Sequence, residues 1–499
     1  MLCNEKLVIQ TIFPQTQISK ALKQNKFFYY INFSSTKNQQ METTVKNNGR
    51  IVAIVVMFFI YAMISFVTNL AAPIGTIWGY QFEGNSVLGM MGNMMNFAAY
   101  LFMGIPAGNL LVKIGYKKTA LWALAVGIVG LFVQFLSSTV GTDTVVTTFT
   151  STDADGVAHS FPITLNFFIY LLGAFICGFC VCMLNTVVCP MLNLLGGGGN
   201  KGNQLLQFGG ALNSFSGTMT PFFVGMLIGV LTDKTQIGDV NPLLFIGIGI
   251  FAVAFVILSF VTIPEPNTTS GKKVKYSHSP WNFRHTVLGV IGIFFYVGIE
   301  VGIPGTLNFY LADQTASGAG VVGQASTIAG AIVAIYWLFM LVGRTLSGFI
   351  SGSVSSRTQL IAVSGAAIIF IILAIFIPKE STLPVPEFLY EGGAEVPVSA
   401  FLLILCGLCT SIMWGGIFNL AVEGLGKYTA QASGIFMMMV VGGGIMPLVQ
   451  NAIAHSIGYM ASYWLVVAML AYLLFYGLVG SKNVNTDIPV DEEPDPRDL

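Results

Sequence analysis

Charged residues are scarce in this sequence. Only 9% of its 499 residues are Asp, Glu, Lys or Arg, whereas 54% are hydrophobic. A soluble domain carries a charge on about a quarter of its residues, so this chain has too little polar surface for a water-soluble fold. Its net charge at pH 7 is zero, so charge gives no reason to expect nucleic acid or an acidic partner. The composition predicts a membrane protein.

Clusters of catalytic, metal-binding or nucleotide-binding groups are also missing. The four histidines are scattered and have no acid pair at catalytic spacing nearby, which disfavours a membrane-embedded lipid or glycan transferase. The glycine string at 196–203 lacks the preceding strand and the Lys-Ser/Thr pair of a phosphate-binding loop. An ATP-driven pump is therefore excluded within this chain, and we expect no cofactor and no metal site.

Apart from Cys3, the seven cysteines lie inside apolar stretches. Cys177 and Cys180, like Cys406 and Cys409, have the C-x-x-C spacing of metal and redox sites. No His or acidic ligand accompanies either pair, and a free cysteine behaves as a small buried hydrophobe. We interpret these residues as packing residues.

Long apolar runs fill most of the chain. A helix needs about 20 residues to cross a bilayer. Six such runs are followed by a polar stretch and six more, which predicts twelve transmembrane helices. The runs lie at 51–79, 86–112, 119–140, 163–195, 205–231, 242–263, 285–312, 322–350, 358–378, 398–424, 433–457 and 461–480.

The loops differ in charge on the two sides. One alternate set is basic, with Lys113, Lys117, Lys201, Arg284 and Arg357 among its members, whereas the opposite set is mainly acidic. The positive-inside tendency makes the basic set cytoplasmic, together with both termini. We thus expect a cytoplasmic extension and lead at 1–50, bundles at 51–263 and 285–481, a central loop at 264–284 and an acidic tail at 482–499.

Two segments stand apart from these bundles. Residues 1–40 contain no apolar run long enough for a secretory signal, and Met41 opens a polar lead before the first predicted span. We expect residues 1–40 to be an upstream extension that folding does not need. The acidic, Pro-containing tail from Asn483 to Leu499 is expected to be disordered.

Weak internal similarity supports duplicated halves. The string LFM followed by small residues and a basic turn begins at Leu101 and again at Leu338. An Asn-Leu pair stands near the end of span 4, at Asn193, and near the end of span 10, at Asn419. Transporters built from repeats bind their substrate between the repeats.

One loop of the first half and three segments of the second half resemble those of a known family. GNLLVKIGYKK from Gly108 is similar to the loop signature of the major facilitator superfamily, with Val112 where the acid normally stands. The segments 294–311, 336–344 and 411–450 resemble the fucose permease and glucose/galactose permease branch. The resemblance covers about residues 50 to 480. It implies an all-α fold of two pseudo-symmetric six-helix bundles and the symport of a monosaccharide by alternating access across a bacterial inner membrane.

Departures from that branch concern the coupling ion. The resemblance places Ala72 and Asn185 where the family carries acids associated with proton coupling and sugar binding. In span 5, Asn213 retains a family Asn, while Gln207 and Gly210 replace a family Asn and Gln. The fold therefore carries over, whereas the proton pathway does not.

Three charged residues are candidates for coupling or gating. An ionisable group inside the bilayer is costly, so its presence indicates a function. Glu300 lies in the middle of span 7 and could exchange a proton, or it could only lock neighbouring helices by hydrogen bonds. Arg344, whose long side chain could reach the surface at the end of span 8, and Glu423, at the end of span 10, are expected to form gate contacts.

Neutral polar and aromatic groups are the candidates for binding a sugar. Hydroxyls of a hexose donate and accept hydrogen bonds, so amides and an aromatic face suit them. The alternative for each amide is a bond that only joins helices. Gln207 and Asn213, six residues apart, are expected to face different surroundings. The candidates are Asn185, Gln207, Asn213, Asn308, Tyr336, Trp414 and Asn419.

The sequence thus predicts a secondary active transporter that imports a neutral monosaccharide, with proton symport as the favoured coupling. Sodium coupling or uncoupled diffusion stay open, as do an amino sugar, a sialic acid or a small oligosaccharide as substrate. No Arg or Lys is expected at mid-depth, which disfavours a carboxylated sugar. The partners expected are the sugar, a coupling cation and the lipid bilayer, around a monomer.

Overall fold

The computed structural model describes residues 49–71, 73–82, 86–152, 158–228, 234–263, 277–322, 324–387, 390 and 393–490. Ala72, the predicted extension at 1–40 and most of the predicted central loop lie outside the described residues.

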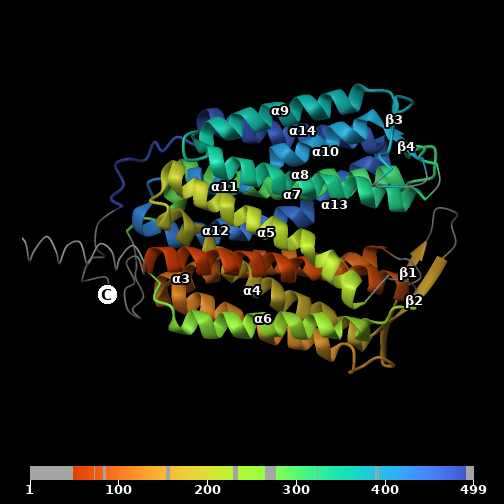
Figure 1. Cartoon of the computed structure of the whole chain (residues 1–499), viewed down its shortest axis with the longest axis horizontal. Helices are drawn as coiled ribbons and strands as arrows, with labels where there is room; N and C mark the ends of the chain where they lie inside the picture. Colours follow the sequence, from red (N-terminus) through yellow and green to blue (C-terminus); the bar gives the residue numbers. More distant parts are fainter. Residues whose placement is uncertain are drawn as a thin grey trace, which may run out of the picture. The chain divides into compact units, whose positions relative to one another are not determined.

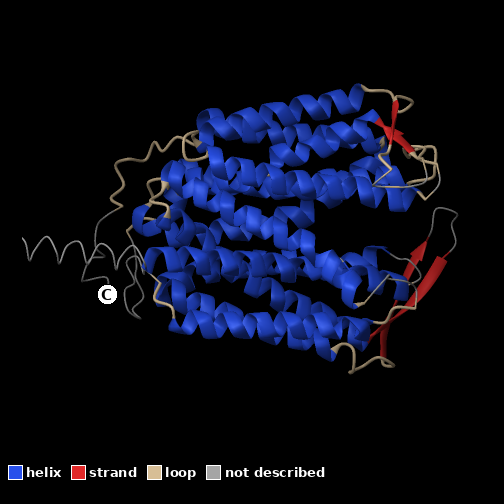
Figure 2. Cartoon of the chain, viewed as in Figure 1, coloured by secondary structure: helices blue, strands red, loops and turns tan. Residues whose placement is uncertain are grey.

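Helices make up most of the described chain (Figure 2). A helix Gly49–Gln81 is followed by α3 (Ser86–Leu136), α4 (Leu165–Leu195), α5 (Gly199–Leu227) and α6 (Asn241–Phe260). The second half contains α7 (Arg284–Ala312), α8 (Ala325–Ile350), α9 (Ser356–Phe376), α10 (Val398–Thr410), α11 (Met413–Ala421), α12 (Thr429–Met438), α13 (Gly442–Ile457) and α14 (Tyr459–Phe475).

Twelve membrane-crossing helices follow from these bounds. Within the described residues, 10 helices are long and apolar enough to span a bilayer. One of them, α3, is two predicted spans merged across Gly115, whose φ of 85° breaks the helical geometry. Helix α5 is less apolar, but its 29 residues are long enough to cross. The expected two bundles of six helices are confirmed.

Two of the predicted spans are broken helices. Span 10 consists of α10 and α11, which are separated at Ser411 and Ile412. Span 11 consists of α12 and α13, joined by a short 3₁₀ turn, Met439–Val441. A break leaves backbone carbonyls available to partners on other helices, and membrane proteins tolerate this where protein or a cavity surrounds the break.

Both β-hairpins lie at the same end of the bundle (Figure 1). Strands β1 (Val145–Thr152) and β2 (Ala158–Thr164) pair antiparallel between α3 and α4. Strands β3 (Thr382–Pro384) and β4 (Glu395–Pro397) pair in the same way between α9 and α10. We call this the hairpin end, and the opposite end, where α4 meets α5 and α8 meets α9, the basic-loop end.

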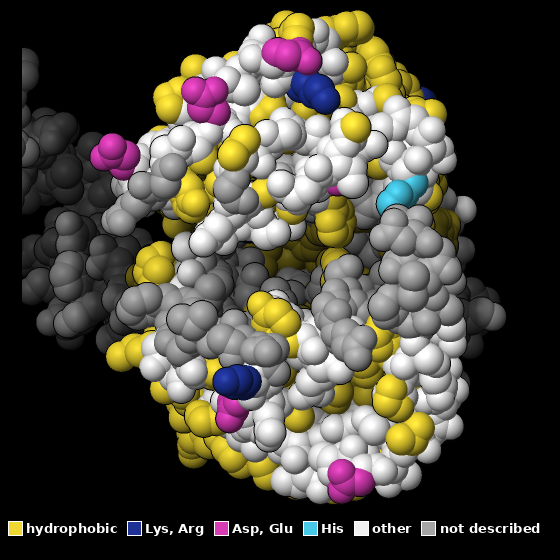
Figure 3. Space-filling view, turned by 90° about the vertical axis from the view of Figure 1, so that its right-hand side faces the viewer, with side chains coloured by type: hydrophobic (Ala, Val, Ile, Leu, Met, Phe, Trp, Pro, Cys, Tyr) yellow, Lys and Arg dark blue, Asp and Glu magenta, His cyan; other side chains and the backbone are white. Residues whose placement is uncertain are grey.

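The two halves pack closely in the part near the basic-loop end. A Cβ atom added to Gly434 of α12 would lie 2.5 Å from the Gly104 carbonyl oxygen of α3. Gly348 of α8 similarly faces the ring of Phe208 of α5, at 2.7 Å from such an added atom. The hairpin end, in contrast, is hollowed at its centre between the described side chains (Figure 3). The halves are therefore closed at one end and apart at the other.

Part of the C-terminal segment packs against the basic-loop end. The Asn485 side-chain oxygen accepts a hydrogen bond from the Arg284 backbone N–H at 3.0 Å, at the start of α7. The Lys427 N–H donates to the Val490 carbonyl oxygen at 3.3 Å. The expectation of disorder is therefore wrong for residues 483–490, because they supply partners for an exposed helix end and a turn. Residues 491–499 lie outside the described residues.

Candidate functional site

A charged pair lies inside the C-terminal half. Glu300, near the middle of α7, accepts a hydrogen bond from the Nη2 of Arg344, on α8, at 3.0 Å. The two side chains are 15% and 12% exposed, respectively. Each charge neutralises the other, which lowers the cost of holding either group at membrane depth.

The guanidinium of Arg344 also joins the two halves. Its Nη1 donates to the Ser214 hydroxyl at 2.6 Å and to the Gly210 carbonyl oxygen at 3.4 Å, both on α5. Its Nε donates to the Ser411 carbonyl oxygen at 3.1 Å, where span 10 is broken. Helix α8 continues past Arg344 to Ile350. The side chain thus lies in the interior, which corrects the expectation that it reaches the surface and that no cation lies at mid-depth.

Aromatic and thiol groups from both halves surround this pair. Tyr296 of α7 lies beside Glu300 and Arg344, and its ring centroid is 6.2 Å from that of Trp414 on α11. Tyr61, on the first helix, lies beside the Cys189 thiol of α4. We call Tyr61, Cys189, Tyr296, Glu300, Arg344 and Trp414 the central cluster.

The central cluster has the chemistry of a sugar site. Trp414 is partly exposed and offers an indole face, and its buried ring nitrogen has no hydrogen-bond partner among the described residues. Tyrosine hydroxyls and the guanidinium supply donors around it, and the carboxylate is an acceptor. A ring with hydroxyls at its edges and apolar C–H groups on its face matches such a set.

Three of the predicted amides donate hydrogen bonds to groups on other helices. Asn185 donates to the Tyr100 hydroxyl at 2.9 Å, within the N-terminal half. Gln207 donates to the Ile412 carbonyl oxygen at 2.9 Å, across to the broken span 10. Asn213 donates to the Tyr61 carbonyl oxygen at 2.9 Å. Gln207 and Asn213 therefore face different surroundings, as predicted.

The remaining predicted residues lie in different parts of the structure. Tyr336 is fully buried, and its hydroxyl lies 2.9 Å from that of Thr410, within the C-terminal half. Asn308 is partly exposed on α7. Asn419 contacts Asn193 across the halves. Glu423 is exposed beyond the end of α11, and its backbone oxygen accepts a bond from the His285 ring.

Several residues of the site carry no signal in the sequence. Tyr61, Ser214 and Tyr296 are ordinary residues of apolar runs, and the resemblance to a family assigned them no role. Their contacts with Arg344 and its neighbours depend on which helices cross. Arg344, in contrast, could be recognised from the sequence as a functional candidate, because a cation within an apolar run is rare.

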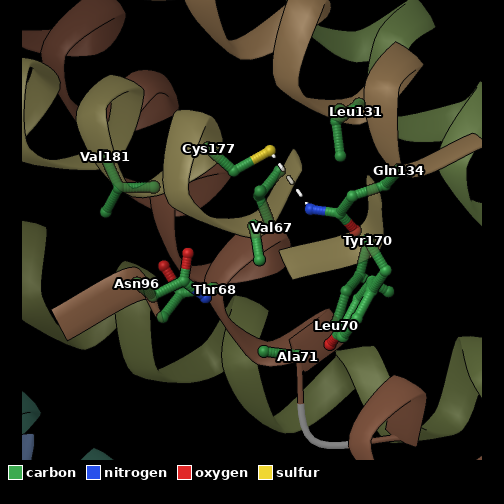
Figure 4. Close-up of a pocket in the computed structure, with 11 residues that line it drawn as sticks. Val67, Thr68, Leu70, Ala71, Asn96, Leu131, Gln134, Tyr170, Cys177 and Val181 are labelled. Atoms are coloured by element: carbon green, nitrogen blue, oxygen red, sulfur yellow. Dashed lines mark hydrogen bonds between the residues drawn. The ribbon is translucent and has the colours of Figure 1, made fainter. Parts of the chain in front are cut away.

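A small polar pocket lies within the N-terminal half (Figure 4). Gln134 of α3 and Cys177 of α4 face each other there, with the Gln134 Nε2 donating to the sulfur at 3.3 Å. Thr68, Asn96 and the buried Tyr170 line the same space. The pocket is built from one half alone, whereas transporters made of repeats bind their substrate between the repeats.

Comparisons with known proteins agree on the fold. The sequence profile of the Major Facilitator Superfamily matches residues 54–447. The glucose/galactose transporter of Brucella abortus is 28% identical over 448 residues, covering 88% of this chain and 96% of that one. The L-fucose-proton symporter of Escherichia coli is 22% identical over 475 residues, covering 89% and 97%.

Solved structures are similar as well. A crystal structure of the transporter FucP in the outward conformation has a TM-score of 0.66 at 18% identity, covering 86% of this chain and 98% of that one. The proton:xylose symporter XylE has a TM-score of 0.58 at 12% identity, covering 86% and 94%. Together with the match of the family profile over most of its length, these findings show that the chain belongs to the Major Facilitator Superfamily.

Proposed function

We propose that this protein imports a neutral monosaccharide by alternating access. The observation that carries the proposal is the central cluster, to which both halves contribute Tyr61, Cys189, Arg344 and Trp414 among others. A site shared by two halves changes when one half rocks against the other. The relatives named as glucose/galactose and fucose transporters support a sugar as the cargo.

The pairing of Arg344 with Glu300 favours a neutral sugar as the substrate. Arg344 would attract the carboxylate of a sialic acid if its charge were free, but Glu300 already pairs with it. A carboxylated sugar would have to displace Glu300 and leave a second carboxylate unpaired in a partly buried site. A neutral hexose or deoxyhexose can use the remaining donors without that cost.

Glu300 supports proton coupling. A proton on this carboxyl would remove the charge that faces Arg344, and Arg344 bonds directly to α5 of the other half. Protonation would thus change the contact between the halves, which is what a coupling ion must do to favour one state. If transport were coupled to sodium, or not coupled at all, Glu300 would remain a fixed partner of Arg344.

We also propose a bacterial inner membrane as the location, with both termini cytoplasmic. The basic loops lie at the end opposite the hairpins, and the positive-inside tendency makes that end cytoplasmic. Helices of the bundle present large apolar side chains at the outside, such as Phe260 and Phe349, which are 85% and 69% exposed. Lipid would cover these surfaces.

Uptake into proteoliposomes tests the proposal. The purified full chain should accumulate labelled D-glucose, D-galactose or L-fucose when the outside is acidified, and unlabelled N-acetylneuraminic acid should not compete. A Trp414→Ala variant should lose this uptake, whereas Trp122→Ala, at an exposed position on α3, should retain it. Uptake of none of these sugars, or equal loss in both variants, would overturn it.

A further inference from the structure

Two asparagines touch each other across the two halves near the basic-loop end. Asn193, in the last turn of α4, donates its amide N–H to the side-chain oxygen of Asn419 on α11. The Asn419 amide nitrogen in turn donates to the Ser356 hydroxyl, at the start of α9, at 2.9 Å. Asn419 is 5% exposed. Both ends of its amide are therefore occupied by protein, which leaves little of it for a sugar.

These two asparagines hold equivalent places in the duplicated halves. Each precedes a leucine and stands near the end of the fourth helix of its own half. When two halves are related by an approximate two-fold axis, a residue meets its own counterpart only where it lies close to that axis. The Asn193–Asn419 contact is thus at the centre of the closed end.

Neighbouring contacts between the halves come in a matched pair. Gln207, on the fifth helix, donates to the Ile412 carbonyl oxygen of the tenth at 2.9 Å. Ser433, on the eleventh, donates to the Thr186 carbonyl oxygen of the fourth at 3.1 Å. The fifth and eleventh helices are equivalent, as are the fourth and tenth. Side chains on each half therefore hold the other half through neutral hydrogen bonds.

We propose that Asn193, Asn419 and Ser356 form an amide latch that keeps the basic-loop end closed in this conformation. Asn419 then acts on the balance between the two states of the carrier and does not bind the sugar. The inference rests on the proposed alternating access, but it concerns a different property, the accessibility of the closed end, that can be measured without any sugar.

Neutral bonds suit a contact that must open in each cycle. A hydrogen bond between uncharged groups contributes modestly in net terms, whereas separating two ions in a buried place is costly. The latch also carries no titratable group, so its closure does not itself respond to pH. Glu423, which the sequence placed at this gate, is exposed and outside these contacts.

Two variants of similar volume separate the latch from a general packing effect. In Asn193→Leu, the side chain has nearly the same shape but no polar atom, so the bond to Asn419 is lost and no turn of the Asn419 amide can restore it. In Asn419→Asp, the carboxylate still accepts from Asn193, and the Ser356 hydroxyl can turn to donate to it. Both variants change the same contact at nearly constant volume, so a packing effect alone predicts equal effects.

The reporter is a cysteine at position 433. Ser433 is fully buried between the halves, so a Ser433→Cys thiol should react with N-ethylmaleimide only when the basic-loop end opens. The background is the full chain with Cys3→Ser. Its six remaining cysteines are buried, and this chain without Ser433→Cys gives their rate of labelling.

We expect Asn193→Leu to raise the labelling rate about fivefold, the change in population for the loss of one hydrogen bond of about 1 kcal/mol. Asn419→Asp should leave the rate unchanged or lower it. Asn193→Ala, which removes the same donor with a smaller side chain, should behave like Asn193→Leu and provides a second variant if Asn193→Leu does not fold. Equal rates in Asn193→Leu and Asn419→Asp, or faster labelling in Asn419→Asp, would overturn the latch. A failed sugar uptake assay would leave this test unaffected.

Discussion

At the scale of single residues, the side chains that matter are those whose polar groups find partners on another helix. Arg344 is the clearest case, because one guanidinium contacts Glu300 on α7, Ser411 at a helix break and Ser214 on the other half. A planar group with several fixed donors suits such a junction. A change at Glu300 should therefore alter contacts in both halves.

Substituting Glu300→Gln should abolish accumulation of sugar while sparing exchange. The Gln side chain keeps an oxygen for Arg344 but cannot gain or lose a proton, so a pH gradient has no group to act on. Uptake under an acid-outside gradient should stop at the equilibrium level, and exchange of internal for external labelled sugar should continue. Glu423→Gln, at an exposed carboxyl, is the matched control and should accumulate normally. Unchanged accumulation in Glu300→Gln would contradict proton coupling through this residue.

Asn213→Ala should abolish uptake without lowering the amount of protein in the membrane. The amide holds the carbonyl of Tyr61 at 2.9 Å, and the Tyr61 ring belongs to the central cluster. Its loss releases α5 from the first helix just where the cluster is assembled. Asn69→Ala serves as a control, because that amide bonds to Ser65 on its own helix. Normal uptake by Asn213→Ala, measured at equal abundance, would remove Asn213 from the site.

Glu300, Arg344 and Trp414 could be singled out from the sequence, although Arg344 was expected at a gate. The other neutral members of the site could not. Glu300 and Arg344 stand out because ions are rare in apolar runs. Tyr61 and Tyr296 look like any tyrosine of a membrane helix. The seven amides and aromatics selected from the sequence were polar or aromatic groups in spans. Their chemistry does not say whether a hydrogen-bond partner lies in the same half, as for Asn185, or in the other half, as for Gln207.

At the scale of helices, glycine decides how closely the halves approach. Gly434 of α12 faces Gly104 and Gly108 of α3, so two backbones cross with no side chain between them. Small residues allow this kind of crossing in membranes. The hydropathy of the sequence predicted where the helices lie, but the breaks in spans 10 and 11 were not predicted, because the apolar runs continue on both sides of each break.

Substituting Gly434→Ala should destabilise the closed conformation. The added Cβ would lie 2.5 Å from the Gly104 oxygen and 2.7 Å from the Gly108 Cα, both backbone atoms that cannot rotate away. Overpacking of this kind costs about 1–3 kcal/mol. The thermal unfolding temperature of the purified protein should fall. The matched change Gly330→Ala on α8, where no atom lies within 4 Å of the added Cβ, should have little effect. Equal shifts in the two variants would show that the α3–α12 crossing is not tight.

At the scale of the whole molecule, the two ends of the bundle have different roles. The hairpin end is hollow at its centre (Figure 3). Arg344 joins the halves at the central cluster, and Gln207 and the amide latch join them nearer the basic-loop end. A carrier in this state receives its substrate from the hairpin side. The direction of import thus depends on which end faces the cytoplasm, and loop charge is the feature of the sequence that bears on it.

Labelling of single cysteines from each side of the membrane tests that orientation. Thr148→Cys in β1 and Ser277→Cys before α7 both place a thiol at an exposed position, in a chain that carries Cys3→Ser and whose other cysteines are buried. The positive-inside tendency predicts that an impermeant maleimide added to intact cells labels position 148 and not 277. Inside-out vesicles should give the reverse pattern, and the background chain should stay unlabelled in both. If position 277 were labelled in intact cells, the hairpin end would face the cytoplasm. The hollow would then open to the inside, and the same conformation would belong to the release step of import.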